Sequence, residues 1–291
     1  MTIETILDAE AIRRFAGKDE GRLVDRIEYK LSTLSKSFTD IHALVALEND
    51  KMIGMLPLCK FRGRTEMIGQ FWAEGYVLPF SNEVWNEMQE RLECPVAIQY
   101  CRENRPGMRQ MPVESSVVSF SRMSDYLHMF NRSDARRDLK KAAVYYEVAD
   151  FGVKYGFDEE DFERLVLFSR ERLGANSRIT ESDRAESFLG LCRYLTSVKS
   201  LVVVNYTIKA QNVGVAFLSH DRIDGSLTFL LGFFDSGHNN FGKYMYITYV
   251  DIACTLGCSK VSAMSPMYRV KSDMQFTGVP MYCYERLYEG I

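Results

Sequence analysis

Residues 230–244 read Leu230-Leu231-Gly232-Phe233-Phe234-Asp235-Ser236-Gly237-His238-Asn239-Asn240-Phe241-Gly242-Lys243-Tyr244. An apolar strand ends here in a polar loop that contains glycine, and a helix begins near residues 241–243. The helix continues to Leu256, and Gly257 ends it as a C-cap. Because this helix is apolar on nearly all sides, we expect it to be buried.

The start of this helix is suited to binding an anion. Its backbone N–H groups and the positive end of its dipole favour a phosphate or pyrophosphate. We therefore expect a donor-binding loop made of Gly237, His238, Asn239, Asn240, Phe241, Gly242 and Lys243.

Other interpretations of the loop remain open. Gly237-x4-Gly242-Lys243 matches the start of a nucleotide P-loop, but Tyr244 stands where Ser or Thr would hold magnesium. The residues after Tyr244 are too few to complete a parallel P-loop sheet. Alternatively, the loop is a glycine-containing turn that only caps a core helix.

Further strands are expected on both sides of this segment. Residues 200–206 and 212–218 precede it as an antiparallel pair, residues 260–264 follow it, and the last strand covers residues 279–284. Similar strands at residues 42–47, 52–58 and 66–72 occur in the first half, behind a segment that reads as helical up to about Phe38. Ile53-Gly54-Met55 and Val213-Gly214-Val215 lie at equivalent places, which suggests an internal duplication.

A basic segment joins the two halves. Residues 131–142 are expected to form a helix with the basic residues Arg132, Arg136, Arg137, Lys140 and Lys141. Asp134 and Asp138 dilute this charge, and a run of this kind is usually a solvated helix face. We expect two lobes, residues 1–145 and 146–291, and because no Gly/Ser-rich or Pro-rich linker is apparent we expect them to pack tightly rather than swing freely.

The composition favours a cytoplasmic globular protein. The chain has 291 residues and a formal charge of −3, which argues against DNA or other nucleic-acid binding through net charge. Its seven cysteines show no disulfide framework and are expected to be reduced thiols, and no metal site is expected from them. The N-terminal residues carry acids and lack the apolar core of a signal peptide, and we expect no membrane span.

The order of elements from residue 130 to 285 resembles the catalytic lobe of the Fem-type and cellulose-biosynthesis-associated (CelD-like) acyltransferases of the GNAT superfamily. Tyr268, Lys271, Phe276 and Gly278 match an element near the end of that lobe, and Arg136-x-x-Leu139-Lys140 resembles the basic helix that precedes it. The resemblance implies an α/β (α+β) fold of two GNAT-like lobes, each a mixed, largely antiparallel sheet flanked by helices. The loop departs from the usual GNAT pattern Gln/Arg-x-x-Gly-x-Gly/Ala.

The resemblance implies an N-acyltransferase. Such an enzyme transfers an acyl group from acyl-CoA or a carrier-protein thioester to a small-molecule or peptide amine, with no permanently bound cofactor. The closest alternative is a Fem-type transferase that uses aminoacyl-tRNA, with Arg136 and Lys140 contacting RNA phosphates. A further alternative is a non-catalytic binding module on the same fold.

Individual roles follow from this hypothesis. Lys271 would stabilise negative charge, and its replacement should slow turnover without unfolding the protein; Tyr268 would protonate the leaving group. Asp235 is either a base or a capping group, with capping favoured. Trp72 and Glu74 are candidates for the acceptor site.

Overall fold

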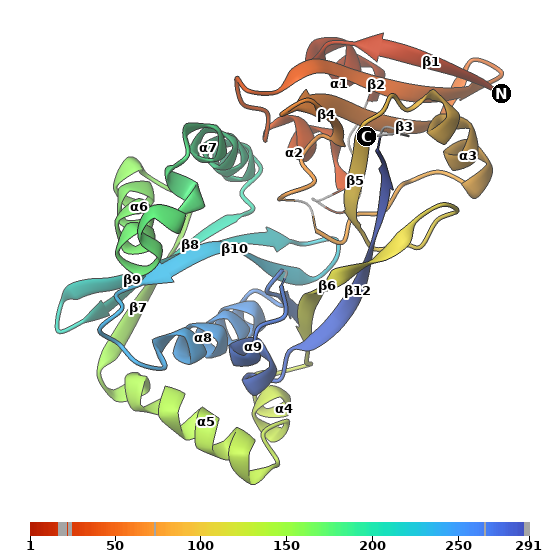
Figure 1. Cartoon of the computed structure of the whole chain (residues 1–291). Coiled ribbons are helices and arrows are strands. Elements are labelled where there is room, and N and C mark those ends of the chain that lie inside the picture. Colours follow the sequence, from red (N-terminus) through yellow and green to blue (C-terminus); the bar gives the residue numbers. More distant parts are fainter. Residues whose placement is uncertain (17–21, 23–24, 73, 265, 288–291) are drawn as a thin grey trace. The chain divides into compact units, whose positions relative to one another are not determined.

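The computed structural model describes residues 1–16, 22, 25–72, 74–264 and 266–287 (Figure 1). The chain divides into two compact units. Unit 1 comprises Met1–Val113, Glu186–Leu191 and Pro280–Ile291, and unit 2 comprises Glu114–Ala185 and Cys192–Val279. This division differs from the expected lobes 1–145 and 146–291, because the last strand of the chain pairs within unit 1.

Unit 1 is built on strands from both ends of the chain. Its elements are β1 (Thr2–Leu7), α1 (Ala9–Ala16), α2 (Ile27–Leu31), β2 (Thr39–Glu48), β3 (Lys51–Phe61), β4 (Arg64–Met67), α3 (Asn82–Arg91), β5 (Val96–Cys101) and the larger part of β12 (Thr277–Arg286). The strands lie in the order β1-β2-β3-β4-β5-β12. The described neighbours are antiparallel except β4 and β5, which are parallel.

Unit 2 holds the remaining elements. They are β6 (Arg109–Ser119), α4 (Met123–His128), α5 (Ser133–Ala143), η2 (Val144–Glu147), β7 (Ala149–Tyr155), α6 (Glu159–Leu173), η3 (Gly174–Asn176), η4 (Arg178–Thr180), α7 (Ser182–Ser197), β8 (Leu201–Ile208), β9 (Gln211–Asp221), β10 (Ser226–Phe234), α8 (Phe241–Thr255), β11 (Lys260–Ser262) and α9 (Arg269–Asp273). The first residues of β6 and the middle of α7, Glu186–Leu191, are assigned to unit 1. The strand order is β7-β8-β9-β10-β11-β6, and only β10 and β11 are parallel. No helix in the described part of the chain is long and apolar enough to cross a membrane.

The order of elements repeats between the units. In each, helices connect the first strand to the second, three antiparallel pairings follow, and a helix connects the fourth strand to a parallel fifth. The fold is therefore α/β with two lobes of the same plan, as the sequence predicted. Gly54 and Gly214 lie on the equivalent strands β3 and β9, and each faces a phenylalanine side chain, Phe80 or Phe234.

The N-terminal expectation was wrong in part. Residues 2–7 form β1 rather than a helix, and they pair antiparallel with β2 from Thr2 opposite Leu47 to Leu7 opposite His42. Thr2, Ile3, Thr5 and Ile6 make up four of the six residues of this segment, and such β-branched residues fit a pleated edge strand. The pairing with β2 overrides the local pattern that suggested a helix.

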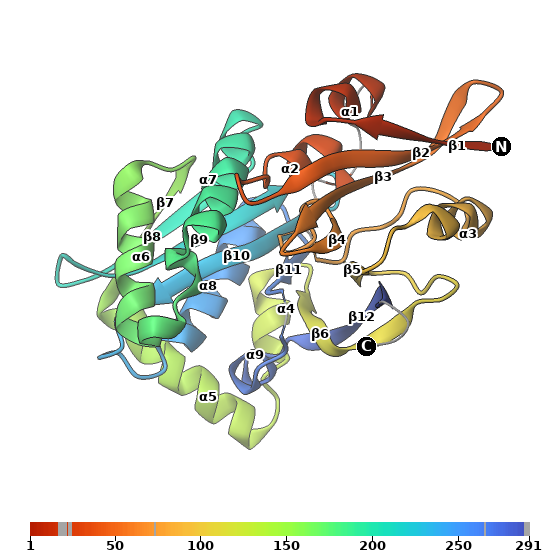
Figure 2. The same cartoon turned by 45° about the horizontal axis from the view of Figure 1, so that its top comes forward.

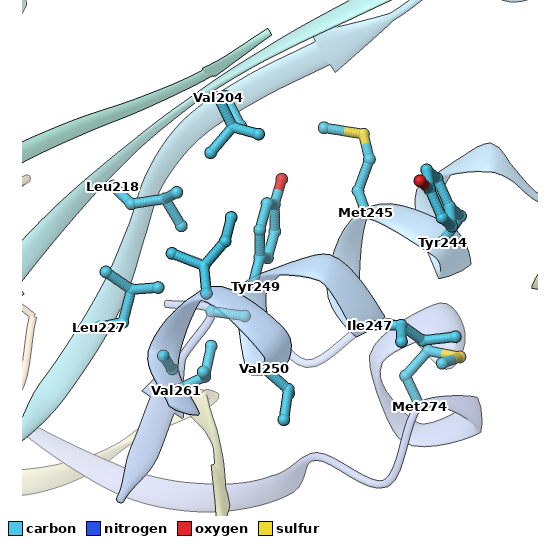
Figure 3. Packing of buried hydrophobic residues seen from close by; sticks show 14 of the residues in the cluster. Val204, Leu218, Leu227, Tyr244, Met245, Ile247, Tyr249, Val250, Val261 and Met274 are labelled. Carbon is cyan, nitrogen blue, oxygen red and sulfur yellow. The ribbon is translucent and has the colours of Figure 1, made fainter. Parts of the chain in front are cut away.

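Helix α8 forms the centre of the core in unit 2. It lies against one face of the sheet, and Tyr249 points toward Val204, Leu218 and Leu227 of that sheet, whereas Val250 points away from them (Figure 3). Helix α6 contacts β9 and β10 on the other face (Figure 2). Most residues of α8 are buried, as its all-round apolar pattern predicted.

Phe241 tests how strongly the start of α8 is fixed. Its side chain is completely buried, with the rings of Tyr145, Tyr206 and Phe234 around it. We expect Phe241→Ala to lower the free energy of unfolding by about 3–5 kcal/mol in denaturant titrations. The exposed control Tyr155→Ala should change it by less than about 0.5 kcal/mol. Equal effects of the two substitutions would show that Phe241 does not anchor the helix.

Candidate functional site

Strands β10 and β11 separate soon after they meet. Their parallel pairing covers only Ser226–Thr228 and Lys260–Ser262. Beyond Thr228, β10 continues to Phe234 with β9 on its other side, and its register with β9 shifts between Phe229 and Leu231. A shift of this kind bends a strand, so the edge of β10 that faced β11 is opened. Backbone groups on such an open edge are available to a ligand.

A cavity of about 610 Å³ lies along this open part of β10. Its walls come from β10, the first turns of α8, the end of α6 and the segment at the start of α9; the lining residues are Arg172, Leu173, Phe229, Leu231, Gly232, Phe233, Phe234, Asn240, Gly242, Lys243, Tyr246, Tyr268 and Val270. The lining is mostly apolar, with a few polar groups. Both the size and the lining are typical of small-molecule sites.

The N-terminus of α8 faces this cavity without a side-chain cap. Asn240 precedes the helix in the left-handed conformation, with φ 64°, and its side chain makes no capping hydrogen bond. Gly242 lines the cavity, and a Cβ atom added to it would lie 3.3 Å from Cε1 of Phe234. The N–H groups of Phe241 and Lys243 already donate to the carbonyls of His238 and Asn240. The N–H of Gly242 and the helix dipole can attract an anionic ligand, and the absence of a side chain at Gly242 keeps the approach open.

Arg172 is a candidate ligand residue that the sequence reasoning missed. It lies in the last turn of α6, and its guanidinium carbon is 4.3 Å from the centroid of the Phe234 ring. Arg172 lines the main cavity and also a hollow of about 420 Å³ beside His238, Asn239 and Asn240. An arginine at a helix C-terminus is ordinary in sequence, so only the fold reveals that it reaches the α8 N-terminus.

Lys243 is already neutralised by two carboxylates. Its Nζ atom lies 2.7 Å from Oδ1 of Asp138 on α5 and 2.9 Å from Oδ2 of Asp273 on α9. Burial opposes the charge of both Lys243 and Asp138, but their hydrogen bond prevails: the pKa of Lys243 is raised and that of Asp138 is lowered. The expectation that Lys243 offers its charge to a donor phosphate is corrected accordingly, because that charge joins α8 to α5 and α9.

Other residues of the expected loop serve the turn itself. The Phe241 side chain is in the core, and the carbonyl of Asn239 accepts a hydrogen bond of 2.6 Å from the Tyr145 hydroxyl. Asp235 Oδ1 accepts a hydrogen bond of 2.9 Å from the N–H of Gly237, and Nε2 of His238 is 3.7 Å from Oδ2 of Asp235. What the loop presents to a ligand in the main cavity is therefore mainly backbone, at Asn240 and Gly242.

Asp235 lies outside the main cavity. It lines a separate polar hollow of about 690 Å³ together with Arg164, Glu171, Asn212 and neighbouring residues. Its hydrogen bond to Gly237 is that of a capped turn, which is the role favoured for it from the sequence. This position favours a structural role over that of a base acting in the main cavity.

Lys271 and Tyr268 have different environments. Lys271 is buried, and Nζ donates hydrogen bonds of 2.6, 2.7 and 2.9 Å to the carbonyls of Ala263, Met264 and Pro266. Tyr268 is 58% exposed, lines the main cavity, and has Lys271 Nζ 5.4 Å from its ring centroid. The expectation that Lys271 stabilises negative charge on a substrate is corrected, because its ammonium is buried and holds the segment that follows β11. Tyr268 remains a candidate for contact with a ligand.

The equivalent gap in unit 1 is filled. Strands β4 and β5 pair only at Thr65 and Glu66, and the fully buried Gln70 lies beside them. Its amide donates to Glu66 Oε2 and accepts from the N–H of Gln99, each at 3.0 Å. The equivalent helix α3 is capped by Ser81, whose Oγ accepts from Val84 N. At the described residues, the gap between the parallel strands is therefore bridged in unit 1 and open in unit 2.

The expected acceptor residues lie in unit 1. The Trp72 indole donates a 3.0 Å hydrogen bond to Ser187 Oγ, and its ring packs 5.1 Å from that of Phe188. Glu74 is half-buried. Their contact with an acceptor stays a prediction.

Arg136 and Lys140 are exposed on α5, with Arg132, Arg137 and Lys141 beside them. Asp138 points inward to Lys243, so it dilutes the outward charge less than the sequence suggested. Of these five basic residues, Lys141 lies near Asp138, with its Nζ 3.6 Å from Asp138 Oδ1.

The described residues contain no group of three or more His, Cys, Asp or Glu side chains arranged to hold a metal.

Comparison with solved structures identifies the architecture. The chain superimposes on FemX with a TM-score of 0.61 at 8% identity, covering 97% of each chain. It superimposes on L-PGS from Bacillus licheniformis with a TM-score of 0.58 at 13% identity, covering 98% of this chain and 93% of that one. A tandem GNAT protein from the clavulanic acid biosynthesis pathway gives 0.54 at 8% identity, over 98% of both.

The chain has a GNAT fold. Neither a protein-family model nor a curated protein matches its sequence. At 8–13% identity the structural likeness concerns the fold alone. Any activity therefore has to be argued from the residues of the cavity.

The ion pairs of Lys243 should make stability depend on pH. We expect Lys243→Met to lower the free energy of unfolding at neutral pH by about 2 kcal/mol, less than for a fully buried pair because Asp273 keeps some solvent access. The lowered pKa of Asp138 gives a contribution present above about pH 4 and lost as the pH falls through the folded-state pKa. The raised pKa of Lys243 gives a contribution to stability that is present below about pH 10 and is lost as the pH rises through its folded-state pKa.

Urea titrations from acidic to alkaline pH would measure this difference between wild type and variant. Asp138→Asn, which removes one carboxylate, should weaken the acid dependence. A difference that stays constant down to about pH 2 would show that the ion pairs do not contribute.

Lys271 provides a second test of the site's framework. We expect Lys271→Met to lower the free energy of unfolding by about 2–3 kcal/mol, because three buried carbonyls lose their donor. Lys140→Met, at an exposed position, should stay within about 0.5 kcal/mol of wild type. If the Lys271→Met variant were as stable as the control, the three hydrogen bonds of Lys271 would not contribute to stability.

Proposed function

We propose that this protein is an N-acyltransferase that forms an amide from an acyl thioester and an amine. The observation that carries the proposal is the cavity along β10, open where β10 leaves β11 and closed at one end by the N-terminus of α8. An extended thioester arm fits beside a free strand edge, and an anionic tail fits the helix N-terminus. Both features belong to unit 2.

The reaction needs few protein groups. The amine nitrogen attacks the thioester carbonyl carbon, the C–N bond forms, and the C–S bond of the tetrahedral intermediate breaks. The nitrogen loses a proton, and the sulfur leaves as a thiolate that takes one up. Backbone N–H groups on the open edge of β10 are placed to stabilise the oxyanion.

Proton transfer is assigned from the cavity lining. Tyr268 lines the cavity and is exposed, so we assign to its hydroxyl the proton that the leaving thiolate takes up. The described lining residues include no carboxylate and no histidine, so water carries the proton away from the amine. Arg172 and the amide of Gly242 bind the anionic end of the donor.

A Fem-type reaction with aminoacyl-tRNA is the second candidate. The outward basic face of α5 favours it, because phosphate contacts by exposed Lys and Arg dominate RNA binding. The transferred group would then leave an ester oxygen rather than a sulfur, and the same open edge of β10 would face the carbonyl. The salt dependence of binding distinguishes the two donors. If Arg136 and Lys140 contact RNA phosphates, replacing them should make tRNA binding less dependent on salt concentration.

The donor test uses acetyl-CoA as the probe. Calorimetry should detect its binding, and incubation with a panel of amines should release free thiol and give acetylated amines by mass spectrometry. We expect Arg172→Gln to weaken acetyl-CoA binding by about tenfold to a hundredfold, because a hydrogen bond to a charged group is lost.

Gly242→Val should weaken binding through its Cβ contact with Phe234, and Gly152→Val is the matched control because its Cβ would meet nothing within 4 Å. Both variants should show normal melting curves. If wild type neither binds acetyl-CoA nor releases thiol, while charging of an amine from aminoacyl-tRNA is observed, the second candidate replaces the first.

A further inference from the structure

The outer side of α5 combines charge with exposed apolar side chains. Arg132, Arg136 and Lys140 follow one another at intervals of four residues, and Arg137 and Lys141 form a neighbouring stripe. All five are exposed; of the two acids on the helix, Asp138 is turned to Lys243, and Asp134 in the first turn is exposed. The protein as a whole has a charge of −3, so this positive surface is local.

Apolar side chains continue this surface beyond the helix. Val144 is 58% exposed, and Tyr146 and Val148 are each 48% exposed. The exposed Glu147 stands between Tyr146 and Val148 in sequence, so these apolar residues are interspersed with an acid. Exposed apolar surface rimmed by polar residues is typical of protein–protein contact sites. We define the α5 surface as the five basic residues together with Val144, Tyr146 and Val148.

The α5 surface lies next to the main cavity along β10. Helix α5 packs against α8, as Figures 1 and 2 both show, and Asp138 of α5 is 2.7 Å from Lys243 in the cavity lining. A partner on the outer side of α5 would therefore be one helix away from the thioester site. The helix is 11 residues long, which corresponds to about 16 Å and suits contact with a single partner helix.

Resting on the proposed thioester chemistry, we propose that the α5 surface docks an acidic carrier protein that presents its acyl group on a phosphopantetheine arm. The acids of such a carrier's helix match the two basic stripes, and apolar residues on it match Val144, Tyr146 and Val148. Nucleic acid would use the charges but not the apolar part, and this favours a protein partner. The transfer step is the one already described, with the arm's sulfur as leaving group.

The experiment uses a purified bacterial acyl carrier protein loaded with a fluorescent short-chain acyl group. The test variant is Arg137→Glu with Lys140→Glu, and the charge-matched control is Arg193→Glu with Lys209→Glu, two exposed positions elsewhere in unit 2. Fluorescence anisotropy at low and physiological salt gives the dissociation constants. Thiol release from acetyl-CoA is measured in parallel, because a small donor does not need the α5 surface.

We expect the test variant to bind the loaded carrier at least about tenfold more weakly than wild type and the control, with unchanged turnover of acetyl-CoA. Tyr146→Ser should also weaken carrier binding. No binding of the carrier by wild type, or equal binding by all variants, would overturn the docking proposal while acetyl-CoA turnover upholds the acyltransferase. Binding of bulk tRNA that is lost in the test variant, without carrier binding, would assign the surface to RNA. If the wild-type protein does not turn over acetyl-CoA at all, that result would instead contradict the proposed function itself.

Discussion

The site depends on the point at which β10 and β11 part. Because a parallel pair of three residues ends at Thr228, the rest of β10 has backbone groups exposed on one edge. A sheet normally closes such an edge with another strand, and here the first turns of α8 and the segment around Tyr268 border the gap instead. The cavity and its polar groups follow from this one interruption of strand pairing.

Two lobes of the same plan have resolved this gap differently. In unit 1 a side-chain amide, that of Gln70, links β4 to β5, and Ser81 satisfies the start of α3. In unit 2 the residue before the corresponding helix is Asn240, whose side chain makes no capping hydrogen bond. A closed gap contributes hydrogen bonds to folding, whereas an open one leaves them for a ligand. The contrast points to unit 2 as the lobe free to bind a substrate.

The sequence predicted the local part of this arrangement well. The apolar strand, the polar loop, the buried helix and its end near Gly257 follow from hydrophobic pattern and turn chemistry within one continuous segment. The roles of charged residues did not follow, because their partners come from elsewhere. Lys243 meets Asp138, which is 105 positions away, and Arg172 reaches the loop from α6. Lys271 was expected to stabilise charge on a substrate because a lysine in sequence gives no sign that three carbonyls will surround it.

Strand β12 sets an order on the assembly of the molecule. Residues 282–286 pair with β5, so unit 1 draws a strand from a part of the chain that lies beyond all of unit 2 in sequence. During synthesis the edge of unit 1 beside β5 therefore stays unpaired until unit 2 has been made. Contacts at such long sequence separation are slow to form, so the pairing of β12 with β5 is expected to be a late step in folding.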